Sequence, residues 1–124
     1  MKVFILEDDA TRIALFQEYG TGKDLTIAKD FGSAKELYQP PYDLMFLDHD
    51  LGDMTYVDSE DENTGYQFAK WLGKAPEDPP HVIIHSFNYY GAKAMCDLLA
   101  DNGWDPVRYP FGKFVLNHLM FGAE

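Results

Sequence analysis

The sequence has little of several features that mark specialised classes of protein. It contains one cysteine, Cys96, so no disulfide can form within the chain, and this fits a reducing compartment. No apolar run approaches the length that spans a membrane, and the first residues show no signal-peptide pattern. There is no repeat, linker or low-complexity tract. We therefore expect one cytoplasmic domain over residues 1–124, without membrane association.

Basic residues are also scarce, with 10 Lys and Arg against 21 Asp and Glu, which gives a net charge of −11. This balance argues against binding of duplex DNA, whose affinity for proteins depends on contacts with phosphates. The acidic residues are unevenly placed, however, and a metal-assisted reaction on a single phosphate stays compatible with them. Many of them follow two strand-like segments: Glu7, Asp8, Asp9, Asp48, Asp50, Asp53, Asp58, Glu60, Asp61 and Glu62.

What the chain does have is a hydrophobic content of 46%, enough for a folded core. Apolar runs predict strands near 2–7, 24–28, 43–48, 82–86 and 106–109. Helical spacing of apolar residues predicts helices near 10–19, 31–38, 64–73, 90–102 and 111–121. Strands that alternate with helices of this length indicate βαβ units and hence a single doubly wound α/β domain.

Two apolar runs end abruptly in acidic residues. Lys2 to Leu6 is followed by Glu7, Asp8 and Asp9, and Tyr42 to Leu47 is followed by Asp48. Ligands of open α/β sheets bind beyond the carboxyl ends of the strands, so these acids predict one shared site. We expect Glu7, Asp8 and Asp48 to hold Mg²⁺ or Mn²⁺ through oxygen ligands. The alternative is a pair of strand-end acids that only cap the first helix, a role we assign to Asp9.

Two histidines accompany these acids. His49 follows Asp48 directly, and His85 ends the predicted fourth strand. Histidine titrates near neutral pH, so we expect His49, Asp50 and His85 to transfer protons around a metal-bound phosphate. With the metal ligand Asp48, they are the expected catalytic residues. A buried histidine hydrogen-bonded to its neighbours is the alternative for His85. His85 and Ser86 face opposite sides within a regular strand, so both reach the site only if the strand ends near residue 85.

Three further residues are candidates for phosphate binding: Ser86, Asn88 and Arg108. Ser86 and Asn88 offer neutral hydrogen-bond donors, although Asn88 is as well suited to cap a helix that starts at Tyr89. Arg108 has a guanidinium that matches phosphate geometry, but its strand position is equally compatible with simple exposure. Arg12, in the first turn of the first helix, is a weaker candidate.

In order and spacing, these motifs resemble the receiver domain of response regulators over nearly the whole chain. Leu6-Glu7-Asp8-Asp9 resembles the acidic pair that holds Mg²⁺ there, and Tyr42 to Asp48 resembles the strand with the phosphoacceptor aspartate. Thr64-Gly65 resembles the start of the third helix, and Ser86 falls where that family keeps a hydroxyl residue. The resemblance implies a five-stranded parallel sheet in the order 2-1-3-4-5.

The chain also departs from that family. Val107-Arg108-Tyr109-Pro110 stands where receivers carry a Lys-Pro pair, so the lysine that pairs with the phosphoryl group is missing. Gly52 stands where receivers usually have a proline, and the loop after Asp48 is longer and acidic. The Asp-His-Asp-Leu-Gly segment from Asp48, with His85-Ser86 and Asn88, resembles the cyclic-phosphate processing receiver domain, a branch proposed to act on cyclic phosphates.

The leading hypothesis is therefore a metal-dependent phosphoesterase that acts on a cyclic or terminal phosphate of a nucleotide or RNA end. The first alternative is a stand-alone signalling receiver that is phosphorylated at Asp48 and binds a protein partner. The second is an inactive receiver-like module that binds a nucleotide or a protein. The sequence shows no Walker loop and no GxSxG or HExxH pattern.

Overall fold

The computed structural model describes residues 1–51, 58, 60–112 and 116–117. Strands and helices alternate along these residues: β1 (Lys2–Leu6), α1 (Ala10–Tyr19), β2 (Asp24–Ala28), α2 (Phe31–Leu37), β3 (Leu44–Leu47), α3 (Gly65–Leu72), β4 (His81–Ile84), α4 (Tyr89–Asp101) and β5 (Pro106–Arg108).

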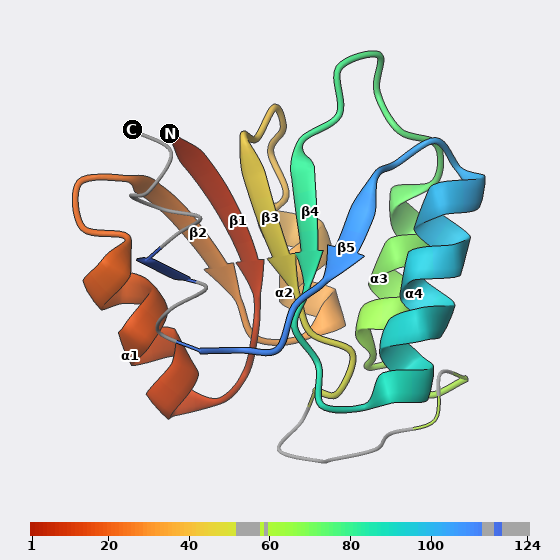
Figure 1. The fold of residues 1–124 in the computed structure, drawn as a ribbon, viewed down its shortest axis with the longest axis horizontal. Helices are drawn as coiled ribbons and strands as arrows, with labels where there is room; N and C mark the ends of the chain where they lie inside the picture. The colour runs from red at the N-terminus through yellow and green to blue at the C-terminus, as the bar shows by residue number, and fades with distance from the viewer. Residues whose placement is uncertain (52–57, 59, 113–115, 118–124) are drawn as a thin grey trace.

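The strands form one sheet in the order β2-β1-β3-β4-β5, and every neighbouring pair is parallel (Figure 1). The predicted α/β class and the strand order are thus confirmed. The ends of the predicted elements differ from the observed ones by at most two residues, mostly because strands stop earlier, where their last residues turn to polar contacts. Most of the helix predicted over 111–121 lies outside the described residues.

Alternate side chains of the strands point to opposite faces, and each face has its own buried cluster. Phe4, Leu6, Met45 and Leu47 pack against α2, α3 and α4. Val3, Ile5, Phe46 and Ile83 pack with Phe16 of α1 and Leu116 on the other face. Cys96 of α4 is partly buried and packs against the first cluster.

The helix starts are set by side chains that accept hydrogen bonds from the first turn. Asp9, Thr64 and Asn88 are the N-caps of α1, α3 and α4. Figure 1 shows these helices beginning at the edge to which the strand arrowheads point. The carboxyl ends of the strands and three helix N-termini therefore meet at one edge. None of the helices in the described part of the chain is both long and apolar enough to cross a membrane.

Candidate functional site

Three polar residues follow β1, β3 and β4 side by side. Leu6 pairs with Leu47, and Leu47 with Ile84, so the next layer consists of Glu7, Asp48 and His85. Backbone hydrogen bonds continue into this layer, from Asp48 N to Leu6 O at 3.1 Å and from His85 N to Leu47 O at 3.1 Å. The sheet register thus brings together three residues far apart in sequence.

The three side chains are buried and close to one another. Each offers one possible ligand atom, and these atoms all lie within 4.8 Å of one another. His85 Nε2 lies 3.0 Å from Glu7 Oε1. Glu7 Oε2 accepts hydrogen bonds from the backbone N–H groups of Asp8 at 3.0 Å and Asp9 at 3.1 Å. Glu7 is therefore held rigidly by the turn that it begins.

The two carboxylates of this cluster differ in their protonation. Burial by itself raises the pKa of Glu7, but the hydrogen bond and charge of His85, with smaller effects of Asp9 N–H and Arg12, outweigh it and lower this pKa to about 2. Burial, with the nearby negative charge of Glu7, raises the pKa of Asp48 to about 7, although His85, Arg12 and Ser86 oppose the rise. Asp48 is thus a carboxylate with too little positive charge around it.

The guanidinium of Arg12 places a positive charge against this cluster. Its Nη1 lies 3.3 Å from Glu7 Oε1 and 3.9 Å from Asp48 Oδ2. Its guanidinium lies over the ring of Phe87 at 4.4 Å and over that of Phe111 at 5.2 Å. Sequence reasoning ranked Arg12 below Arg108. The signal that favours Arg12 is its distance of three residues from the N-cap Asp9, which places it on the first turn above Glu7.

Two of the predicted site residues lie outside the cluster. Asp8 is half-buried and contributes its backbone N–H to Glu7, but its carboxylate is not part of the group of ligand atoms found among the described residues. Arg108 is exposed on β5, one layer before His85, and its guanidinium lies 5.4 Å from the ring centroid of Tyr89.

His49, Asp50 and Asn88 form a buried hydrogen-bonded group of their own. His49 Nδ1 lies 2.7 Å from Asp50 Oδ1, and Asn88 Nδ2 donates to the same oxygen at 3.1 Å. Asn88 Oδ1 accepts from Gly91 N at 2.9 Å, so this residue caps α4, as one of the two interpretations predicted. A Cβ on Gly91 would lie 2.6 Å from the His49 ring, so only glycine allows this close packing.

This buried group is linked to the cluster through the backbone N–H of Asp50. Asp50 N donates to Asp48 Oδ1 at 3.4 Å. His49 follows the strand position of Leu47, on the face covered by α3 and α4, whereas Asp48 follows Phe46 on the face covered by α1. The arrangement therefore suits orientation of Asp48 by its two neighbours.

Ser86 and His85 both reach the site. His85 keeps the side that the alternation along β4 gives it, against Phe16 and Phe46, and β4 ends at Ile84, so Ser86 is not bound to the opposite side. The condition stated from the sequence is thereby met. Ser86 makes a side-chain hydrogen bond with Asp48, and its Oγ also accepts from Asn88 N at 3.1 Å. Ser86 thereby joins the start of α4 to Asp48.

The residues present fit a divalent cation. Two carboxylates and an imidazole converge, and a positive ion beside them would lower the raised pKa of Asp48. Oxygen and nitrogen donors together suit Mn²⁺ and similar transition metals, whereas Mg²⁺ prefers oxygen alone. Within the described residues, His85 Nδ1 is buried without a hydrogen-bond partner. The ring is held instead by edge contacts with Phe16 and Phe46 and a tilted contact with Phe111.

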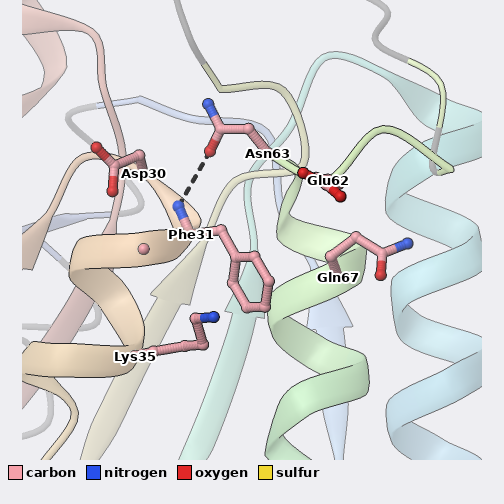
Figure 2. A pocket seen from close by; sticks show the side chains of 7 residues that line it. Asp30, Phe31, Lys35, Glu62, Asn63 and Gln67 are labelled. Carbon is pink, nitrogen blue, oxygen red and sulfur yellow. Dashed lines mark hydrogen bonds between the residues drawn. The ribbon is translucent and has the colours of Figure 1, made fainter.

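A separate hollow of about 660 Å³ lies between the starts of α2 and α3 (Figure 2). It is lined by Asp30, Phe31, Gly32, Lys35, Glu62, Asn63 and Gln67. Phe31 N donates to Asn63 Oδ1 at 3.0 Å, which ties α2 to the loop before α3. None of the predicted site residues lines this hollow, so it is distinct from the acidic cluster.

Comparison with protein families now places the chain. The family model described as the cyclic-phosphate processing receiver domain matches residues 1–101. The chain belongs to this family. The match includes the whole Glu7, Asp48 and His85 layer and the His49, Asp50 and Asn88 group. No curated protein matches the sequence.

Solved structures agree on the fold. The receiver domain protein from Methanospirillum hungatei JF-1 has a TM-score of 0.64 at 15% identity, covering 98% of this chain and 91% of that one. The Mn²⁺-bound form of response regulator Rcp1 has a TM-score of 0.58 at 16% identity, covering 98% and 90%. TrrA from Thermotoga maritima, in complex with Mg²⁺-BeF, has a TM-score of 0.61 at 18% identity, covering 96% of both chains. The receiver fold is therefore shown.

Proposed function

We propose that this receiver domain is a metal-dependent phosphoesterase that acts on a cyclic or terminal phosphate of a nucleotide or RNA end. The observation that carries the proposal is the buried layer of Glu7, Asp48 and His85 with Arg12 against it. Glu7, Asp48 and His85 hold the cation, Mn²⁺ in preference to Mg²⁺. The Mn²⁺-bound structure of Rcp1, a protein of the same fold, supports a divalent cation as the cofactor.

Arg12 takes the role of the lysine that receivers place after the fifth strand. Its guanidinium already contacts both carboxylates, and a cation on those carboxylates would release it for the phosphate. The fork of an arginine suits two phosphate oxygens at once. Ser86, at the start of the loop before α4, adds a hydroxyl beside Asp48.

In the reaction, a water oxygen bonds to phosphorus and one ester P–O bond breaks, so the leaving oxygen gains a proton and a phosphomonoester or free phosphate results. A bound divalent cation polarises phosphoryl oxygens and lowers the pKa of a water molecule. The protein orients the phosphate through Arg12 and fixes Asp48 through Ser86 and Asp50 N. His49 and Asp50 act on the reaction by positioning Asp48, since their side chains bond to each other and to Asn88.

A signalling receiver is the second candidate, because Asp48 directly follows β3, where the receivers that the sequence resembles carry their phosphoacceptor, and is hydrogen-bonded to Ser86. Among the similar structures, TrrA is in complex with the histidine kinase ThkA, with a TM-score of 0.61 at 18% identity. In this reading Asp48 would be phosphorylated and a protein partner would read its state.

The experiment that tests the proposal measures hydrolysis of 2′,3′-cyclic nucleotides, 3′,5′-cyclic nucleotides and phosphate-ended RNA in the presence of Mn²⁺. Wild-type protein should turn over at least one of them, and Arg12→Ala should lower kcat/KM about 10²-fold or more, a usual loss for removal of a phosphate-stabilising donor. Lys70→Ala is the control, because Lys70 is an exposed base in the last turn of α3, at the end of that helix away from the cluster.

The same preparations are then treated with a small phosphodonor such as acetyl phosphate. Absence of turnover on every substrate, together with stable labelling of Asp48, would reject the phosphoesterase and establish the signalling receiver.

A further inference from the structure

Exposed aromatic side chains gather where β4 leads into α4. Among the described residues, Phe87, Tyr89 and Tyr90 have 59%, 53% and 83% of their surface exposed. The rings of Tyr89 and Tyr90 are 5.5 Å apart and nearly perpendicular. Exposed aromatic surface is costly in a soluble domain, and a continuous patch of it usually marks a binding surface.

Two arginines lie against this aromatic patch, which we define as Phe87, Tyr89 and Tyr90, and one of them, Arg12, also reaches the candidate site. Arg12 lies over Phe87 at 4.4 Å while its Nη1 contacts Glu7 at 3.3 Å, and Arg108 lies over Tyr89 at 5.4 Å. In a chain with only 10 basic residues, two of them are therefore stacked on this one patch. A phosphate bound by Arg12 would therefore lie beside the ring of Phe87.

The patch is also held rigidly. Asn88, between Phe87 and Tyr89, is buried and caps α4 through Gly91 N while it donates to Asp50. The aromatic rings on either side of it consequently project from a fixed turn and the first turn of a helix. Fixed aromatic faces beside positive charge are the features with which proteins bind nucleobases, because every base offers a face for stacking.

We propose that the aromatic patch binds the nucleobase next to the phosphate, so that the substrate is a nucleoside phosphate. This inference rests on the proposed function and adds to it the surface that binds the base. The net charge of −11 disfavours a long nucleic-acid backbone, so the ligand is a mononucleotide or the last nucleotide of a single strand. A protein partner on the same patch is the competing occupant.

The test compares adenosine 2′,3′-cyclic phosphate with glycerol 1,2-cyclic phosphate, which has the cyclic phosphate but no base. Dissociation constants are measured with Mn²⁺ by calorimetry for wild type and for a Tyr89→Ala/Tyr90→Ala variant, which leaves Arg12 and its contact with Phe87 in place. The variant should bind the nucleotide about 5- to 150-fold more weakly, the usual value of one stacked base, and should bind the glycerol compound as wild type does.

Trp71→Ala is the control, because Trp71 is a similarly exposed aromatic residue on α3, stacked on Phe68. It should bind both ligands as wild type does. The affinity for short RNAs that end in a 2′,3′-cyclic phosphate is also measured. Comparison with the affinity for the free nucleotide shows which of the two the protein prefers.

Equal affinity of wild type for the two ligands, or an unchanged affinity of the double variant for the nucleotide, would overturn the inference and leave the patch to a protein partner. Binding is measured without reference to turnover. Base-dependent binding without hydrolysis would therefore uphold the base-binding surface and reject the phosphoesterase. Hydrolysis of both compounds with equal KM would uphold the phosphoesterase and reject the base-binding surface.

Discussion

At the scale of single residues, the site is governed by one carboxylate whose charge is poorly balanced. Asp48 lies beside Glu7, whose pKa is lowered to about 2, and burial raises the pKa of Asp48 to about 7. Arg12 at 3.9 Å is too far for a direct hydrogen bond to it. The folded protein therefore keeps a feature that costs stability unless a cation is bound, as is usual for functional sites.

The pH dependence of stability should reveal this cost. Between the ordinary pKa of an aspartate and about 7, folded Asp48 holds a proton that the unfolded chain has released, so its contribution to stability falls as the pH rises through this window. With a chelator present, Asp48→Asn should melt at a higher temperature than wild type at a pH of about 8, and the difference should shrink toward a pH of about 4. A difference independent of pH would contradict the raised pKa. The exposed Asp105→Asn should show no such trend.

Glu7 should behave in the opposite way. Its pKa is lowered in the folded state, so its charge contributes stability that is present above the ordinary pKa of glutamate and is lost as the pH falls toward 2. Glu7→Gln should therefore lower the melting temperature of the metal-free protein near neutral pH, and less so in acid. An unchanged melting temperature near neutral pH would mean that His85 and Arg12 do not stabilise this carboxylate.

At the scale of secondary-structure elements, two glycines allow helices to approach the ends of the strands. A Cβ on Gly65, the first residue of α3, would overlap the backbone oxygen of Asp48. A Cβ on Gly91 of α4 would lie 2.6 Å from the His49 ring. Both helices thus press on the segment that carries Asp48, so its geometry depends on α3 and α4 as well as on β3.

Gly65→Ala should disturb the site from the side of α3. Crowding of this kind typically costs about 1–3 kcal/mol in the free energy of unfolding, and here it displaces the backbone of Asp48 itself. We expect a lower midpoint in urea denaturation together with weaker Mn²⁺ binding. Gly32→Ala in α2 is the matched control, because its Cβ would lie 3.6 Å from the nearest side chain. If both variants unfold at the same urea concentration, the close approach of α3 has no energetic importance.

At the scale of the whole molecule, the fold was predictable because its signals are local and ordered along the chain. Buried runs such as Val3–Leu6 and Leu44–Leu47 have no polar residue, as strands covered on both faces require, and Thr64 and Asn88 are recognisable helix caps. Glu7, Asp48 and His85 were also identifiable as strand-end residues that gather at one edge. The family match and the receiver-like neighbours agree with the predicted fold.

The finer composition of the site was not predictable from local patterns. Which of Glu7 and Asp8 faces the cluster depends on the strand register, and the position of Arg12 depends on how α1 packs over β1. His49 and His85 each follow a buried strand and look alike in sequence. In the structure His49 packs against Gly91 of α4 and His85 lies beside Glu7, because the two side chains lie on opposite faces of the sheet. These distinctions belong to tertiary packing.

The account depends on the cation site more than on any other claim, and titration of metal-free protein with Mn²⁺ tests it most directly. Wild type should bind one Mn²⁺, with coupling to the His85 nitrogen in pulsed electron paramagnetic resonance. At about 100 times the dissociation constant, bound Mn²⁺ should stabilise the protein by about 2.7 kcal/mol. His85→Ala should lose the nitrogen signal, Asp48→Asn should bind far more weakly, and Asp105→Asn should match wild type. Equal binding by all four proteins, or none by wild type, would contradict the account.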